Sequence, residues 1–149
     1  MRLLKQSDPI WASEKIGNSQ STLARYGCLL TCLSMLSDWY GTFHTPGWMA
    51  RNLSFTSDGR LLWQSIRPPM RFVYRYYKRD DAKIKSILFS KDNAVILEVP
   101  AFNAKHWVLV VGFSRWAGYK IADPFDGTTK WLDKSYRNIT GFAEITRAI

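Results

Sequence analysis

The chain has 149 residues, of which 46% are apolar and 15% aromatic, so it is too apolar for a disordered segment and fits one domain with a single core. No apolar run reaches the roughly 18 residues that a membrane-spanning helix requires, so we expect no such helix. The formal net charge of +9 favours anionic neighbours such as nucleic acid, anionic lipid or a bacterial wall polymer.

The N-terminal segment predicts a loop and no signal peptide. Its first residues, MRLLKQSDPIW, contain only two leucines as an apolar stretch, which does not fit the apolar centre of a signal peptide. We therefore expect the protein to stay in the cytoplasm of the producing cell or to be released without a signal. We also expect it to be a monomer. Residues 6–27 are rich in Ser, Asn and Gly and predict a long ordered loop, with a short helical turn at 10–14.

Helical patterns occupy much of the next part of the chain. The longest covers residues 28–40, where apolar residues recur at spacings of three and four and form a broad face. Thr31, Ser34 and Asp38 take its other side, and Gly41 is placed to end it. Shorter helices are predicted at 46–53, 61–66 and 80–90.

Strand patterns dominate the final third. Alternating, β-prone segments predict strands at 70–77, 94–99, 106–113, 118–123, 128–132 and 142–148. Short turns such as RWAG and PFDG separate them, which favours an antiparallel meander. Helices first and strands later predict an α+β fold, with a helical half around the central buried helix and a C-terminal antiparallel sheet.

The two cysteines, Cys28 and Cys32, lie four residues apart at the start of the long helix. Side chains at this spacing stack along one helix face without the geometry of a disulfide, so both are expected to be free thiols. Cys28 sits at the positive end of the helix dipole, which favours the thiolate, and Gly27 lets the backbone approach a substrate closely. Cys28 is therefore the candidate nucleophile, although a core role is the ordinary explanation for a cysteine there.

His106 and Asp123 are the residues that would complete such a site. A thiolate nucleophile needs an imidazole that carries the proton to the leaving group. His106 opens a very apolar strand, whereas the other histidine, His44, lies in a loop. Asp123 ends the next strand, and counting back from the RWAG turn places residues near 106 and 123 opposite each other. Asp123 is thus expected to hold the second ring nitrogen; taken alone, an Asp-Pro pair is an ordinary turn signal.

The order of these motifs resembles that of the bacteriocin-leader-peptidase-like cysteine peptidases of bacteria and phages, whose domains have a papain-like fold. The matching segments are QSDPIWA, GNS, YGCLLTCLSML, AVILEV, HWVLVVGF and YKIADPFDG, which together extend from residue 6 to about residue 127. The resemblance implies a Cys28–His106–Asp123 triad that cleaves a peptide or amide bond in a peptide or protein substrate, with no cofactor or metal.

The resemblance also implies a glutamine upstream of the cysteine, whose amide donates to the oxyanion. Gln6 stands in the matching motif, but it lies 22 residues before Cys28, farther than in many papain-fold enzymes. Gln20, eight residues before Cys28, is the alternative.

Two other functions remain open. The first is a zinc site, because the chain has four side chains of the types that bind zinc: Cys28, Cys32, His44 and His106. A CxxxC pair inside one apolar helix has unusual geometry for zinc, however. The second is an inactive papain-like module that binds peptides or a polyanion, because RPPMRFVYRYYKR, residues 67–79, interleaves arginines with aromatic residues. The same segment fits an edge strand with Met70, Phe72, Tyr74 and Tyr76 inside and Arg71 and Arg75 outside.

Overall fold

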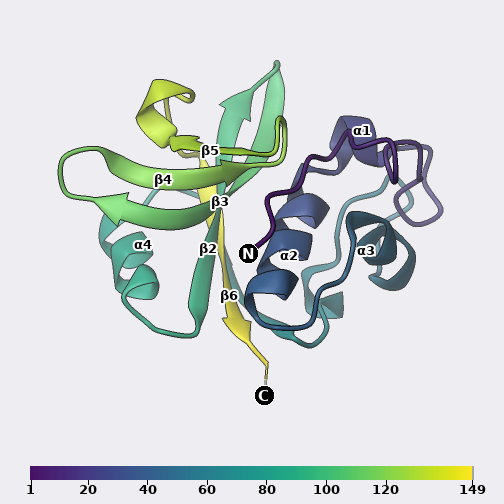
Figure 1. Ribbon diagram of the computed structural model, residues 1–149, viewed down its shortest axis with the longest axis horizontal. Coiled ribbons are helices and arrows are strands. Elements are labelled where there is room, and N and C mark those ends of the chain that lie inside the picture. Colours follow the sequence, from purple (N-terminus) through teal and green to yellow (C-terminus); the bar gives the residue numbers. More distant parts are fainter. Residues whose placement is uncertain (149) are drawn as a thin grey trace.

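The computed structural model describes residues 1–148 and shows an α+β architecture, with three helices beside a six-stranded sheet and a fourth helix on its other side (Figure 1). This confirms the predicted class. The helices are α1 Leu23–Tyr26, α2 Cys28–Trp39, α3 Pro46–Asn52 and α4 Asp81–Leu88, with 3-10 turns η1 Trp63–Ser65 and η2 Leu132–Lys134. The strands are β1 Met70–Tyr76, β2 Asn93–Ala101, β3 Ala104–Ser114, β4 Gly118–Asp123, β5 Thr128–Trp131 and β6 Gly141–Arg147. None of the helices within residues 1–148 has the length and apolarity of a membrane span.

The strands follow the order β1-β6-β2-β3-β4-β5, and every neighbouring pair is antiparallel. The predicted meander is correct for β2 to β5, which follow one another through short turns. It is wrong at the other end of the sheet, because β6 inserts between β1 and β2. Ile145 of β6 pairs with Phe72 of β1 on one side and with Ala94 of β2 on the other. The strand that carries His106, β3, therefore lies inside the sheet.

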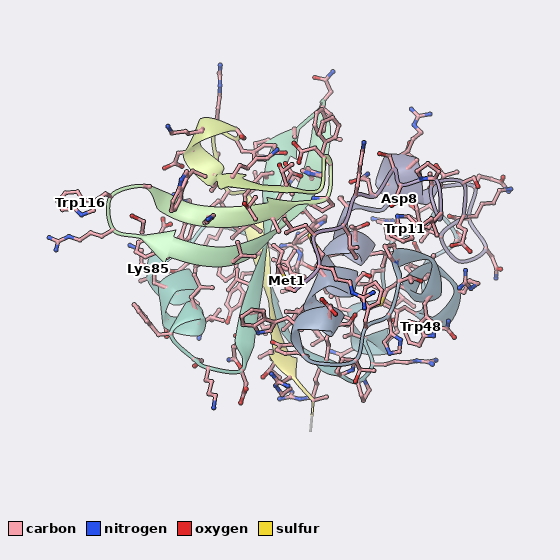
Figure 2. All side chains as sticks on the ribbon, in the orientation of Figure 1. Met1, Asp8, Trp11, Trp48, Lys85 and Trp116 are labelled. Carbon is pink, nitrogen blue, oxygen red and sulfur yellow. The ribbon has the colours of Figure 1, made fainter. Side chains whose placement is uncertain are left out.

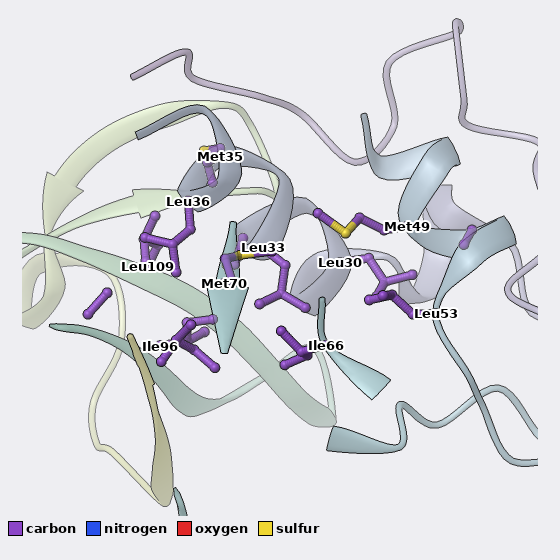
Figure 3. Packing of buried hydrophobic residues seen from close by; sticks show 14 of the residues in the cluster. Leu30, Leu33, Met35, Leu36, Met49, Leu53, Ile66, Met70, Ile96 and Leu109 are labelled. Carbon is purple, nitrogen blue, oxygen red and sulfur yellow. The ribbon is translucent and has the colours of Figure 1, made fainter. Parts of the chain in front are cut away.

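Helices cover both faces of the sheet. On one face, α2 packs Leu33 and its neighbours against Ile96 and Leu109 (Figure 3). On the other face, α4 packs Ile84 against residues such as Val95. Each such fully buried aliphatic side chain stabilises the fold by about 1.5–3 kcal/mol. The start of α2 is also tied to β3, because the Cys32 Sγ donates to the Trp107 carbonyl oxygen at 3.5 Å.

Two of the three polar side chains that we expected on the other side of α2 do not face solvent, whereas Asp38 is partly exposed. Thr31 and Ser34 are fully buried, since their hydroxyls donate to the carbonyl oxygens of Gly27 and His44 and so leave no polar group unpaired. Trp39, which the apolar pattern placed inside, is 61% exposed at the C-terminal end. The helix ends as predicted, with Gly41 at a φ of 97° just beyond it.

The predicted sides of β1 are half correct. Met70 is buried and Phe72 and Tyr76 are partly buried, as expected. The register then shifts between Phe72 and Tyr74, and such a bulge turns the following side chains to the other face. Tyr74 is therefore exposed, and the Arg75 side chain lies inside the structure, only 12% exposed.

The N-terminal segment is ordered by hydrogen bonds across the molecule. It forms turns over residues 6–13, in place of the helix that we expected at 10–14. The Trp11 Nε1 donates to the Lys5 carbonyl oxygen at 3.0 Å, and the Gln6 backbone N–H donates to the Pro124 carbonyl oxygen at 2.8 Å. The second bond links the N-terminal segment to the turn between β4 and β5.

Candidate active site

A groove of about 1280 Å³ runs between the start of α2 and the start of β3. We call it the site groove. Among the residues that line it are Gln6, Cys28, Trp63, Phe102, His106 and Phe125. A second pocket, of about 390 Å³, lies between α2 and α4, and the described residues that line it include no cysteine, histidine or carboxylate. Three of the four residues expected to carry the chemistry therefore share one concave surface.

The structure brings His106 and Asp123 into direct contact. The His106 Nε2 lies 2.7 Å from the Asp123 Oδ1, and both side chains are almost fully buried. As expected, residues near 106 and 123 face each other across the ladder, since the β3–β4 register shifts at Val111 and pairs Leu109 with Ala122. Asp123 is consequently level with Val108, and His106 reaches it along the diagonal of the sheet face.

Asp123 is held by more partners than the sequence suggested. Its Oδ1 also accepts from the Phe125 backbone N–H at 3.0 Å. Its Oδ2 accepts from the Tyr136 hydroxyl and lies 3.1 Å from the Lys130 Nζ. Burial raises the pKa of Asp123, but the hydrogen bonds from His106 and Tyr136 outweigh it and hold that pKa far below its usual range. The carboxylate is thus fixed and charged at any pH near neutral.

Tyr136 and Lys130 are partners of Asp123 that sequence reasoning missed. Tyr136 follows η2, and Lys130 lies on β5, whose register with β4 pairs Asp123 with Thr128. No motif marks either residue. The only sequence signal is that a buried carboxylate needs several donors, which does not say where along the chain they come from.

Cys28 lies at the first position of α2, next to the imidazole. With Nε2 occupied by Asp123, the ring of His106 has Nδ1 left for the thiol. Burial lowers the pKa of His106, but hydrogen bonds to Asp123 and to Cys28 raise it to about 9. His106 is therefore an imidazolium at neutral pH, placed between a carboxylate and a sulfur.

Cys32 is placed differently, in the core. It is fully buried, and desolvation together with the nearby Cys28 raises the pKa of its thiol. Both cysteines are free thiols, as expected, but only Cys28 faces the site groove.

The two candidate glutamines occupy very different places. Gln6 lines the site groove and is only 6% exposed. Its Nε2 donates to the Ala24 carbonyl oxygen at 3.1 Å, whereas its Oε1 is buried and has no hydrogen-bond partner among the described residues. Gln20 is exposed, and its Oε1 accepts from Lys15 at 2.9 Å, away from the groove lining. Of the two glutamines, only Gln6 lines the site groove together with Cys28 and His106.

The four residues considered for zinc form no metal site within the described part of the chain. The ring of His44 stacks on Trp48 at 3.8 Å between centroids, in the segment between α2 and α3. Within residues 1–148, no three His, Cys, Asp or Glu side chains form a group that could hold a metal ion.

The arrangement combines a thiol, an imidazolium and a fixed carboxylate in an open groove, which is the equipment of nucleophilic acyl transfer. Comparison with known proteins adds no family to this geometry: no protein-family model matches the chain, and no curated protein matches it either.

Proposed function

We propose that the protein is a papain-like cysteine peptidase or amidohydrolase that cleaves a peptide or amide bond with Cys28, His106 and Asp123. One observation carries the proposal. The imidazole of His106 lies 2.7 Å from a buried carboxylate on one side and adjoins the Cys28 thiol on the other, at the wall of the site groove. A structural histidine needs no such pair of partners, whereas a thiol nucleophile needs both.

The proposed reaction has two stages. The Cys28 sulfur attacks the carbonyl carbon as a thiolate, the C–N bond breaks, and His106 gives its Nδ1 proton to the leaving nitrogen. Water then attacks the thioester carbon and passes a proton to His106, so that the acid is released and the thiolate–imidazolium pair is restored. Asp123 keeps the ring oriented and stabilises its positive charge throughout.

Two donors are proposed for the oxyanion. The Cys28 backbone N–H lies in the first turn of α2, where N–H groups have no acceptor within the helix. Gln6 supplies the second donor, since an amide nitrogen carries two hydrogens and the bond to Ala24 uses one. A donor of this kind contributes roughly 3 kcal/mol to transition-state stabilisation.

The polyanion-binding alternative has less support. Its central residue, Arg75, forms an ion pair of 2.8 Å with Glu98, and both side chains are almost buried. Glu98 also accepts from Lys105 at 3.3 Å, so two of the cations near the groove are already neutralised in part. An inactive module that binds peptides in the same groove is the outcome that remains if the chemistry fails.

Alkylation of the thiols tests the proposal. Iodoacetamide at pH 6 should label Cys28 roughly 10- to 100-fold faster than it labels a free thiol such as glutathione, because the imidazolium of His106 adjoins the sulfur. Cys28→Ala should abolish the fast labelling, and Cys32→Ser, the matched control, should retain it. A peptide library incubated with wild type and with Cys28→Ala then shows cleavage directly. Labelling no faster than glutathione, with no cleaved peptide, would refute the proposal.

A further inference from the structure

Two exposed phenylalanines stand beside the proposed triad. Phe102 is 64% exposed and Phe125 is 51% exposed, yet their rings stack on each other with centroids 4.7 Å apart. The Phe102 ring also meets the His106 ring edge to face at 5.7 Å. We call Phe102 and Phe125 the aromatic platform. Large apolar side chains left in solvent at a groove wall are typical of a binding surface.

The backbone holds Phe102 in place in an unusual conformation. Ala101 pairs with Ala104, so Phe102 and Asn103 form a two-residue hairpin loop, with φ angles of 54° and 59°. Such a loop favours Asn or Gly at both positions, and a bulky residue is rarely found at positive φ. Strain of this kind is concentrated at functional sites. Phe125 is fixed independently, through the bond from its backbone N–H to Asp123.

The chemistry decides which part of a substrate would meet the platform. His106 gives its proton to the leaving nitrogen, so the leaving half of the substrate must lie on the His106 side of the thiol. The platform adjoins that ring, whereas Trp107, the next residue of β3, points to the opposite sheet face and meets Trp63 at 5.5 Å. The platform is therefore next to the first residue after the cleaved bond.

We propose that the aromatic platform binds the side chain of the residue that follows the cleaved bond, and that it selects peptides or amides whose leaving amine carries a large aliphatic or aromatic side chain. This inference rests on the proposed function. A cationic side chain is disfavoured there, because the imidazolium of His106 meets the Phe102 ring edge to face. Small and acidic side chains are also disfavoured, because they bury little apolar area against the two rings.

The test uses two variants that remove the rings without disturbing the turns. Phe102→Asn suits the positive φ of the hairpin, and Phe125→Ala keeps the backbone N–H that Asp123 needs. Trp116→Ala is the matched control, since Trp116 is 88% exposed at the β3–β4 turn, on the side of the sheet away from α1 and α3 (Figure 2). The substrates are peptides that differ only in the residue after the cleaved bond: Phe, Leu, Ala, Lys or Glu.

Wild type should cleave the Phe and Leu peptides with a kcat/KM about 10-fold above that of the Ala peptide. Each platform variant should reduce that ratio severalfold, and Trp116→Ala should leave the ratio unchanged. Equal ratios in wild type and both variants would overturn this inference while leaving the proposed function intact.

A binding measurement covers the case in which no peptide is cleaved, which would count against the proposed function alone. Saturation-transfer NMR compares phenylalaninamide with alaninamide, each as a model of the leaving amine, on wild type and on Phe102→Asn. A signal for phenylalaninamide that Phe102→Asn removes supports the platform even without catalysis. The same weak signal for both amides, or one that survives Phe102→Asn, would contradict it.

Discussion

At the scale of single residues, the site depends on how each polar group divides its hydrogen bonds. Asp123 accepts from His106, Tyr136 and the Phe125 N–H, so neither oxygen is free to rotate away from the imidazole. Lys130 adds a positive charge at 3.1 Å. The ring of His106 is consequently held in one orientation, with Nδ1 turned toward sulfur.

The two glutamines give the sharpest test at this scale. Gln6→Ala should lower kcat by roughly 10²- to 10³-fold, because it removes a donor that acts chiefly in the transition state. Gln20→Ala should leave kcat unchanged, since Gln20 is exposed and its side chain accepts a hydrogen bond from Lys15. Steady-state kinetics on the best peptide from the library measures both.

A structural effect must be separated from a catalytic one in that experiment. Gln6 is buried, so its loss also affects packing, and the iodoacetamide rate of Cys28 serves as the control. Alkylation forms no oxyanion, so the rate should stay within about twofold of wild type in Gln6→Ala. An equal fall in the alkylation rate and in kcat would assign Gln6 a structural role. A fall in kcat for Gln20→Ala would assign the oxyanion donor to Gln20 in place of Gln6.

At the scale of elements, the junction between α1 and α2 positions the nucleophile. Gly27 separates the two helices, and its N–H donates to the Leu23 carbonyl oxygen at 2.8 Å. A Cβ at Gly27 would collide with that oxygen and would lie 2.9 Å from the Leu23 Cα. Its φ of −86° is ordinary, so the glycine is required for space and not for backbone freedom, a different reason from the substrate approach that we inferred from the sequence.

Gly27→Ala should therefore destabilise the protein by about 1–3 kcal/mol, the usual range for an overpacked site, and slow Cys28 alkylation as α2 shifts. Gly112→Ala is the control, because a Cβ there would meet only the Lys120 Cβ, at an ordinary 3.6 Å. Urea unfolding of both variants gives the comparison. Equal stability of the two would show that α1 and α2 can separate without cost.

The sequence predicted elements well where local patterns decide them. The bounds of α2, α3 and β4 agree within one residue with the expected segments. Apolar periodicity, the helix start at Pro46 and the helix stop at Gly41 are all local signals. The place of β6 in the sheet and the bulge that turns Arg75 inward depend on distant strands. Periodicity carries no information on such pairing.

The residues of the candidate site were predicted to a similar extent as the helices and strands. Cys28, His106 and Gln6 stand in motifs, and the structure brings them to one groove together with Asp123 on its buried side. Tyr136 and Phe102 come from loops with no motif of their own, and Phe125 stands in the segment YKIADPFDG, whose match assigned it no role. The catalytic role of the triad, the papain-like fold, the single domain and the monomeric state stay predictions.

At the scale of the whole molecule, the site exists only because distant segments meet. The N-terminal segment reaches the β4–β5 turn through Gln6 and Pro124, and α2 reaches β3 through Cys32 and Trp107. His106 then couples the chemistry to folding. Burial lowers its pKa, but hydrogen bonds to Asp123 and Cys28 raise it from 6.5 to about 9 in the folded protein. The folded state thus binds this proton more tightly than the unfolded chain.

The sign of the pH dependence follows from that difference. Protonation of His106 stabilises the fold fully below about pH 6.5, and the stabilisation is lost as the pH rises through about 9. His106 should thereby lower the free energy of unfolding by up to about 3 kcal/mol between pH 6 and pH 9.5. The proposed thiolate of Cys28 contributes a slope of the opposite sign, because the unfolded chain binds a proton at that sulfur and the folded protein does not. Urea unfolding at intervals over this range is therefore measured on Cys28→Ala, in which only the slope from His106 remains. Asp123 adds no slope there, because its pKa lies far below the range.

Two variants assign that slope to its cause. Cys28→Ala has no thiol to offset the imidazolium, so its curve should fall, with its upper end at a lower pH because one of the groups that raise the pKa of His106 is gone. The double variant Cys28→Ala/His106→Gln keeps a donor for Asp123 but cannot titrate at position 106, so its curve should be flat between pH 6.5 and pH 9. A Cys28→Ala curve no steeper than that of the double variant would show that the imidazolium gains nothing from Asp123 on folding. The pairing of His106 with Asp123 on which the proposed chemistry depends would then lose its energetic basis.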